Sequence, residues 1–140
     1  MMLLLDTNII SEIMKKFPDE SVMQWLRQQH SLTLYVSSIS IAEMRYGLSI
    51  MPEGKKRSRL ESSFVSVMQS AFYQRVFVFD ENAAIQYAAL MSKNKKMGIV
   101  MSTFDAQIAS IAIATRSLLV TRNTKDFIHC GIQIINPFEN

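Results

Sequence analysis

The sequence predicts an α/β fold, namely a three-layer α/β/α sandwich around a mostly parallel central sheet of about five strands. Two observations lead to this prediction. Short apolar or β-branched runs alternate along the chain with longer segments in which apolar residues recur at helical spacing. Strands that are separated by helices pair in parallel, with helices on both faces of the sheet. The 140 residues suit one domain, residues 1–140, and no linker or internal repeat divides them.

The first strand is expected at residues 1–5, where five consecutive apolar residues indicate a strand buried on both faces. Further strands are expected at 32–36, 76–79, 117–120 and 132–135. Helices are expected at 7–16, 19–30, 37–51, 55–72, 80–96 and 103–116. The alternation of these segments supports the parallel sheet.

Composition narrows the class of protein. A hydrophobic content of 49% with only 4 Gly and 3 Pro favours a compact, helix-rich chain over a disordered one. The single cysteine, Cys130, excludes an internal disulfide and indicates a reducing, cytoplasmic location. No apolar run reaches the ~20 residues of a membrane-spanning helix. A net charge of +3 is compatible with a polyanionic partner.

Four acidic residues occupy unusual positions: Asp6, Glu43, Asp105 and Asp126. Three of them follow a predicted strand closely, and Asp105 begins a helix on a face of small or apolar residues. The carboxyl ends of parallel strands meet the amino ends of the following helices at one edge of the sheet. We therefore expect these acids to converge there. Carboxylates without accompanying His or Cys indicate a hard cation, Mg²⁺ or Mn²⁺, of the kind that phosphodiester hydrolysis uses.

Simpler structural roles compete with this interpretation. Asp6 is well placed to cap the following helix, and Ser40 with Glu43 forms a capping-box pattern. Ser102 with Asp105 forms a similar arrangement, and Asp80 is expected to be a helix cap. The remaining acids stand beside polar neighbours and are expected to be solvated: Glu12, Asp19, Glu20, Glu53, Glu61, Glu81 and Glu139.

Four ordered segments carry a resemblance to a known family. They are Asp6-Thr7-Asn8, residues 38–47 (SISIAEMRYG), residues 105–112 (DAQIASIA) and residues 119–127 (LVTRNTKDF). In this order and at this spacing they resemble the PIN-domain ribonucleases, specifically the toxin half of VapBC-type and FitAB-type toxin–antitoxin pairs. The similarity extends from Met1 to the terminal segment 135–138.

The resemblance implies a PIN-like fold, Mg²⁺-dependent endoribonuclease activity and inhibition by a cognate antitoxin protein. It also implies a homodimer, a toxin–antitoxin hetero-oligomer, and contact with operator DNA only through the antitoxin. Asp6 and Asp105 match the principal metal-ligand acids, and Glu43 matches the third. Relatives differ at the fourth position, which is either Asp126 or Asn123 here. We assign Asp126 to it, with Asn123 as a polar residue that orients the site. Asn8, Ser40 and Thr121 match polar positions around the metal.

Binding of RNA requires positive side chains. Arg122 and Lys125 are the first candidates, because they flank the predicted site. Further candidates, each of which has a simpler explanation as a solvated surface residue, are Lys55, Lys56, Arg57, Arg59, Lys93, Lys95 and Lys96.

One alternative function stays open: a PIN module with little or no catalysis, acting mainly through a DNA-binding antitoxin complex. Two other classes fit the sequence less well. A phosphotransferase of the haloacid-dehalogenase type also begins with a strand ending in Asp, but it needs a second Asp where this chain has Asn8. The acid spacing does not fit a receiver-like phosphoacceptor domain.

Overall fold

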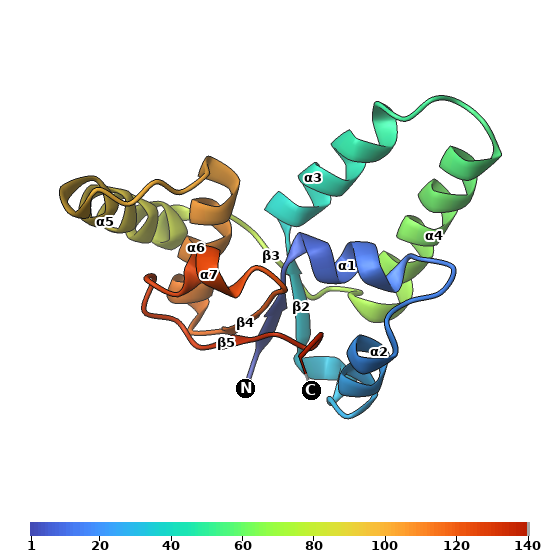
Figure 1. Cartoon of the computed structure of the whole chain (residues 1–140), viewed down its shortest axis with the longest axis horizontal. Helices are drawn as coiled ribbons and strands as arrows, with labels where there is room; N and C mark the ends of the chain where they lie inside the picture. Colours follow the sequence, from blue (N-terminus) through green and yellow to red (C-terminus); the bar gives the residue numbers. More distant parts are fainter. Residues whose placement is uncertain (140) are drawn as a thin grey trace.

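The computed structural model describes residues 1–139 and confirms the predicted three-layer α/β fold. The sheet has five strands in the order β3-β2-β1-β4-β5, and all its pairings are parallel (Figure 1). The strands are β1 (Leu3–Leu5), β2 (Leu34–Ser37), β3 (Val76–Phe77), β4 (Leu118–Val120) and β5 (Ile134–Ile135). Because β1 lies in the centre, the residue that follows it lies at the middle of the sheet edge.

The helices form the two outer layers. One layer consists of α1 (Thr7–Ile13), α2 (Glu20–Arg27), α3 (Ser38–Ser49) and α4 (Lys55–Ala71). The other consists of α5 (Glu81–Met97), α6 (Thr103–Thr115) and α7 (Thr124–Phe127), on the opposite side of the sheet (Figure 1). A short 3₁₀ helix, η1 (Ser31–Thr33), precedes β2. Within residues 1–139, no helix is both long and apolar enough to cross a membrane.

The β1 side chains divide the core in two. Leu3 and Leu5 belong to the cluster beneath α1, α2, α3 and α4, whereas Leu4 belongs to the cluster beneath α5 and α6. This alternation follows from the two-residue repeat of a strand. All three leucines are at most 6% exposed, as predicted for a strand covered on both faces. The result is a rigid central strand that ends at Asp6.

Several element bounds differ from the prediction. The first helix ends at Ile13 instead of residue 16, and the expected third and fifth strands shrink to two residues each. Residues 32–33 lie in η1, so β2 starts at Leu34 and continues to Ser37. The four-residue helix α7 was not expected. Edge strands and single-turn helices carry too few apolar positions to produce a clear periodic pattern.

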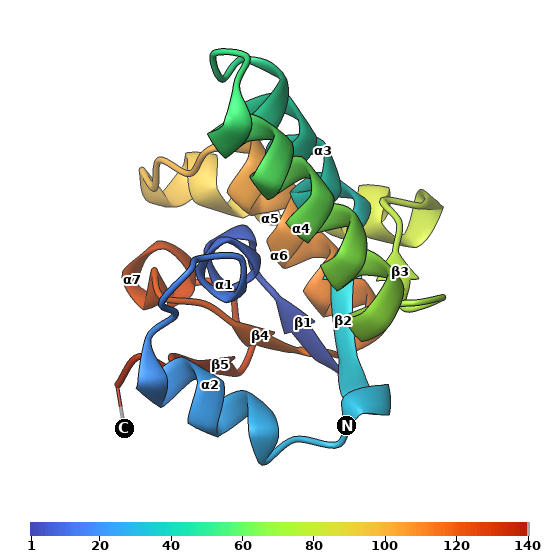
Figure 2. The ribbon, with the colours of Figure 1, turned by 90° about the vertical axis from the view of Figure 1, so that its right-hand side faces the viewer.

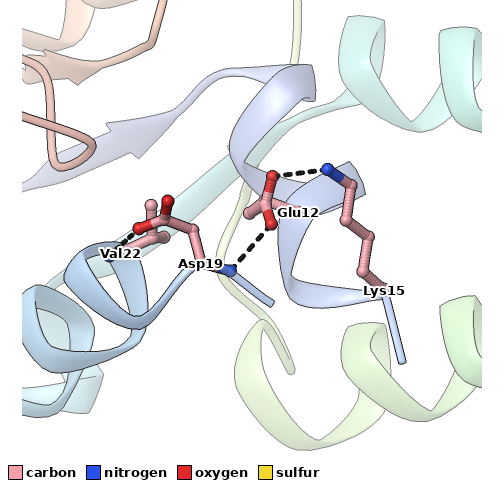
Figure 3. A network of polar contacts seen from close by, with 4 residues as sticks. All are labelled: Glu12, Lys15, Asp19 and Val22. Atoms are coloured by element: carbon pink, nitrogen blue, oxygen red, sulfur yellow. Dashed lines mark hydrogen bonds and ion pairs between the residues drawn. The ribbon is translucent and has the colours of Figure 1, made fainter. Parts of the chain in front are cut away.

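Glu12 differs most from its sequence-based expectation. It was expected to be solvated, but it is 5% exposed at the junction of α1 and α2 (Figure 3). Its carboxylate accepts hydrogen bonds from Lys15 Nζ at 2.9 Å and from the Asp19 amide at 2.8 Å. Asp19 in turn caps α2 by accepting from the Val22 amide at 3.2 Å. Its partners are the Lys15 side chain, one turn further along the chain, and the amide of Asp19, so a polar sequence context around Glu12 does not indicate exposure.

Candidate active site

The site lies at the carboxyl edge of the sheet, toward which the strands rise in Figure 1. Asp6, directly after β1, is 4% exposed and begins α1. Its Oδ1 accepts from the Thr7 amide at 2.8 Å, and its Oδ2 accepts from the Thr121 hydroxyl at 2.8 Å. Asp6 is therefore a helix cap, as its simpler interpretation proposed. It is also held in a fixed orientation across two neighbouring strands.

Asn8 and Thr121 join the two central strands around Asp6. Thr121 lies opposite Asp6 because Leu5 is paired with Val120 in the sheet. Asn8 Nδ2 lies 3.3 Å from both Asp6 Oδ2 and Thr121 Oγ1, and Asn8 Oδ1 accepts from the Arg122 amide at 3.2 Å. Because each partner has a defined donor or acceptor, this network fixes one rotamer for the Asp6 carboxylate.

Glu43 reaches the same edge from α3. The Thr7 hydroxyl donates to Glu43 Oε1 at 2.8 Å and also lies 2.8 Å from Ser40 Oγ. The capping-box interpretation of Ser40 and Glu43 is wrong, because the N-cap of α3 is Ser37, whose hydroxyl accepts from the Ser40 amide. No role was predicted for Thr7 from the sequence, although the compact Asp-Thr-Asn motif was a signal for one.

Asp105 and Asp126 approach from the other layer. Asp105 lies in the first turn of α6, where its amide donates to Ser102 Oγ at 3.1 Å, as the predicted cap requires. Asp126 lies in α7, and both acids line one hollow beside the Asp6 site. The side chain of Asn123 makes no hydrogen bond within residues 1–139, but its amide donates to Thr121 Oγ1 at 3.1 Å.

The electrostatics connect the four acids. Burial raises the pKa of Asp6 to about 6, the hydrogen bonds from Thr121 and the Thr7 amide oppose this change, and the charges of Asp105 and Glu43 add to it. Burial also raises the pKa of Asp105, with a further contribution from the charge of Asp126. Acids from four segments of the chain are thus close enough for their charges to interact.

The donor set at this edge fits a hard cation. Carboxylate and hydroxyl oxygens surround the site, and a divalent ion would stabilise the ionised form of Asp6 against its burial and against the charges of Asp105 and Glu43, which together raise its pKa. Among the described residues, no three Asp, Glu, His or Cys side chains are already as close as the ligands of one ion. The acids are therefore neighbours rather than a closed set of ligands.

The candidate RNA-binding residues divide into two groups. Arg122 and Lys125 follow β4 at the site edge, and the Arg122 guanidinium lies 4.5 Å from the centre of the Phe138 ring. Lys55 and Lys56 begin α4 at the turn farthest from the sheet (Figure 2). Arg57 is engaged in an ion pair with Glu61 at 2.6 Å. The position of the first pair suits an RNA strand at the acids better than that of the second.

Two hollows on the side of α5, α6 and α7 differ in the residues that line them. The hollow that Asp105 and Asp126 line has a volume of 380 Å³ and also includes His129, for which no chemistry was predicted from the sequence. A larger hollow of 470 Å³ includes Lys93 and Cys130, and no acidic residue within 1–139 lines it. Burial raises the pKa of the Cys130 thiol to about 11, which suits a buried packing role for this side chain.

Comparison with known proteins shows close relatives over nearly the whole chain. The PIN domain family profile matches residues 3–131. VapC ribonuclease Y4jK of Sinorhizobium fredii is 41% identical, with 99% of each chain covered. Plasmid stability protein StbB of Pseudomonas syringae pv. tomato is 39% identical, again with 99% of each chain covered.

A solved structure shows the same fold. The structure of FitAB bound to an IR36 DNA fragment contains a chain that superposes with a TM-score of 0.91 at 34% identity. The alignment covers 99% of the present chain and 97% of that one. The arrangement of strands and helices around the acidic edge is therefore shared with a protein from a DNA-bound assembly.

Proposed function

Because the chain belongs to the PIN domain family, we propose that it is a metal-dependent endoribonuclease and the toxin of a toxin–antitoxin pair. The observation that carries the chemistry is the buried Asp6 carboxylate, whose pKa rises to about 6 beside Asp105 and Glu43. A site that concentrates negative charge favours a cation over a protein side chain as its partner. The substrate class follows from the 41% identical VapC ribonuclease.

In this proposal Asp6, Glu43 and Asp105 hold Mg²⁺, or Mn²⁺, through carboxylate oxygens. When bound there, the ion supplies positive charge to the RNA phosphate and lowers the pKa of water. Thr121, Asn8 and the Thr7 amide keep Asp6 in one orientation, and Thr7 does the same for Glu43 through its hydroxyl. Asp126 orients water from the side of α7. Arg122 and Lys125 receive the RNA backbone.

Replacement of Asp6 by Asn tests this assignment. The Asp6→Asn variant keeps the shape of the side chain but removes its charge, so we expect RNA cleavage to fall by at least about a hundredfold. The measurement is cleavage of a single-stranded RNA by the purified chain in Mg²⁺, with EDTA as the metal-free control. Glu20→Gln is the matched control, because Glu20 is exposed on α2. Wild-type cleavage by Asp6→Asn would refute the assignment.

The alternative function, a weakly catalytic module acting through an antitoxin–DNA complex, gives the opposite result. In that case the wild-type chain alone cleaves no RNA in Mg²⁺, and Asp6→Asn matches it. Both functions include the antitoxin as a partner, for which the DNA-bound FitAB structure is the precedent. The homodimer stays a prediction.

We also propose where the antitoxin binds. A hollow of 430 Å³ lies between α1, α3 and α4, and its walls are mainly apolar. They include Met14, Met44, Leu48, Met51 and Leu60. Thr7 and Glu43 line the same hollow, so an apolar helix laid into it would also cover the acidic site. Inhibition would then follow from obstruction of the site.

A further inference from the structure

The hollow beside Asp105 and Asp126 has features that catalysis by the acids does not require. It lies between the loop at 98–102 and α7, with a volume of 380 Å³. Besides the two acids, its walls include Val100, Lys125 and His129. A space of this size, next to the bond to be cut, is of the order that a small organic group occupies.

The 98–102 loop, which forms one wall of this hollow, is held in place by contacts with the end of α5. Gly98 adopts the left-handed conformation that ends α5, at a φ of 70°, and the Ile99 amide donates to the Asn94 carbonyl at 2.8 Å. The Asn94 side chain is 2% exposed and lies 3.6 Å from Met101 Sδ. The wall is therefore preorganised, which lowers the cost of binding a ligand against it.

His129 is poorly explained as a packing residue. Its Nε2 is buried and has no hydrogen-bond partner within residues 1–139. A buried nitrogen without a partner destabilises the fold, so an apolar side chain of similar size would pack at lower cost. The imidazole is partly exposed, and it contributes an aromatic ring to the wall of the hollow. Aromatic rings, including that of histidine, are the surfaces on which proteins stack unpaired RNA bases.

Two neighbours extend the same argument. Val100 is 98% exposed at the hollow, and an apolar side chain this exposed is available for contact with a base. Lys125 is exposed in α7 and makes no ion pair within the described chain. Its ammonium group can therefore contact the phosphate of the same nucleotide.

We propose that this hollow receives the base of one RNA nucleotide adjacent to the cleaved phosphodiester, stacked on the His129 ring. The inference rests on the proposed ribonuclease function and adds a binding residue to it. His129 acts on affinity and on the choice of cleavage site, whereas the acids act on the chemical step.

Three variants separate stacking from packing. His129→Phe keeps an aromatic ring. His129→Leu introduces an apolar side chain of similar size without a ring, and His129→Ala has neither the ring nor the bulk. We expect Phe to bind RNA as the wild type does, and Leu and Ala to bind roughly fivefold to a hundredfold more weakly, the range for one stacked base. Phe and Leu should both raise the melting temperature, because each removes the unpaired nitrogen.

Binding is measured by fluorescence anisotropy with a labelled single-stranded oligoribonucleotide of mixed sequence, at constant low salt. The variants are made in the Asp6→Asn background, so that cleavage does not interfere. The same variants are also made in the chain that retains Asp6 and cleaves RNA. Sequencing of the cut ends should then show a base preference next to the cut that His129→Phe keeps and His129→Leu loses. His30→Leu is the control, since His30 caps η1 directly before β2 and therefore lies at the amino edge of the sheet, opposite the acids.

The results distinguish the proposed stacking site from the proposed nuclease function. Equal RNA affinity for His129→Leu and His129→Phe would overturn the stacking proposal, even where cleavage still requires Asp6. Absence of RNA binding by the Asp6→Asn chain would overturn it as well. Loss of affinity in His129→Leu and His129→Ala but not in His129→Phe, combined with a wild-type chain that cuts no RNA in Mg²⁺, would support the stacking site and refute the nuclease.

Discussion

At the scale of single residues, burial of the Asp6 carboxylate costs stability, and the proposed metal binding would explain why the carboxylate is there. A buried carboxylate whose pKa rises to about 6, from an ordinary value of 3.8, holds its proton more tightly in the folded chain than in the unfolded chain. Ionisation therefore favours unfolding. A neutral isostere would avoid this cost, so retention of the charge points to a partner that the chain itself does not supply.

This difference predicts the pH dependence of stability in EDTA. Below about pH 4 both states are protonated; as pH rises from about 4 to 6, the unfolded state loses its proton first and stability falls by up to about 3 kcal/mol. Asp6→Asn cannot ionise, so it should lack this fall and be more stable than the wild type at pH 7.5. Urea unfolding at several pH values measures both effects.

Addition of Mg²⁺ provides the control for that experiment. An ion that binds only the folded chain should stabilise the wild type at pH 7.5 and leave Asp6→Asn nearly unchanged. Glu20→Gln should follow the wild type throughout. An Asp6→Asn chain that is less stable than the wild type in EDTA would contradict the physical account of this carboxylate.

The residue scale also shows what sequence patterns miss. Asp6, Glu43, Asp105 and Asp126 were expected at one edge, because parallel strands bring their carboxyl ends together there. Asn8 and Thr121 were expected beside them only from the resemblance to the PIN-domain ribonucleases. Glu12 and His129 were misjudged or passed over, because their environments come from segments that turn back over them: the amide of Asp19 for Glu12, and the 98–102 loop for His129. No local periodicity records such contacts.

At the scale of secondary structure, the junction of α1 and α2 fixes the orientation of α1. Glu12 near the end of α1 accepts from the amide of Asp19, which caps α2 (Figure 3). Since α1 begins at Asp6, Thr7 and Asn8, a tilt of this helix would displace three of the polar groups in the site. Burial acts to raise the pKa of Glu12, but the hydrogen bonds from Lys15 and the Asp19 amide outweigh it, and the net pKa is lowered.

Glu12→Gln should therefore destabilise the chain by about 1 to 2 kcal/mol at neutral pH, because the amide cannot accept both hydrogen bonds. A lowered pKa means that this contribution is present above the ordinary glutamate pKa and is lost as pH falls below it. The difference from the wild type should thus shrink in acid. Urea unfolding at neutral and acidic pH measures it.

Glu61→Gln is the matched control, because the Glu61 ion pair with Arg57 is partly solvated and contributes little. The Lys15 contact is likewise to a side chain that is 58% exposed, so the Asp19 amide accounts for most of the expected effect. A Glu12→Gln variant as stable as Glu61→Gln at neutral pH would show that the junction does not depend on this carboxylate.

The lengths of the helices and strands show a second limit of prediction from the sequence. The long helices α4, α5 and α6 end within one residue of their predicted bounds, because each continues over several turns between recognisable start and stop residues. The two-residue strands β3 and β5 owe their extent to their neighbours β2 and β4. The single turn α7, which carries Asp126, has no apolar stripe at all. The elements that the sequence predicts least well thus include the one that carries Asp126.

At the scale of the whole molecule, the acidic edge adjoins two hollows of different character. The one between α1, α3 and α4 is lined mainly by apolar side chains, and the one beside α7 combines polar and charged groups. The first suits an apolar protein helix, and the second suits a nucleotide. Both share residues with the acidic edge, so an occupant of either one lies next to the acids of the proposed active site.

The apolar hollow predicts a separable defect in regulation. Met51→Lys places a charge in its wall, so binding of the cognate antitoxin should weaken roughly tenfold to a hundredfold, because an apolar helix laid into the hollow would bury that charge. RNA cleavage by the lone chain should stay at the wild-type rate, because Met51 lies beyond α3, away from the acids. Titration of cleavage with the antitoxin measures both quantities.

Met97→Lys, at a residue that is 61% exposed on α5, is the control and should remain fully inhibitable. Equal inhibition of the two variants would place the antitoxin on another surface.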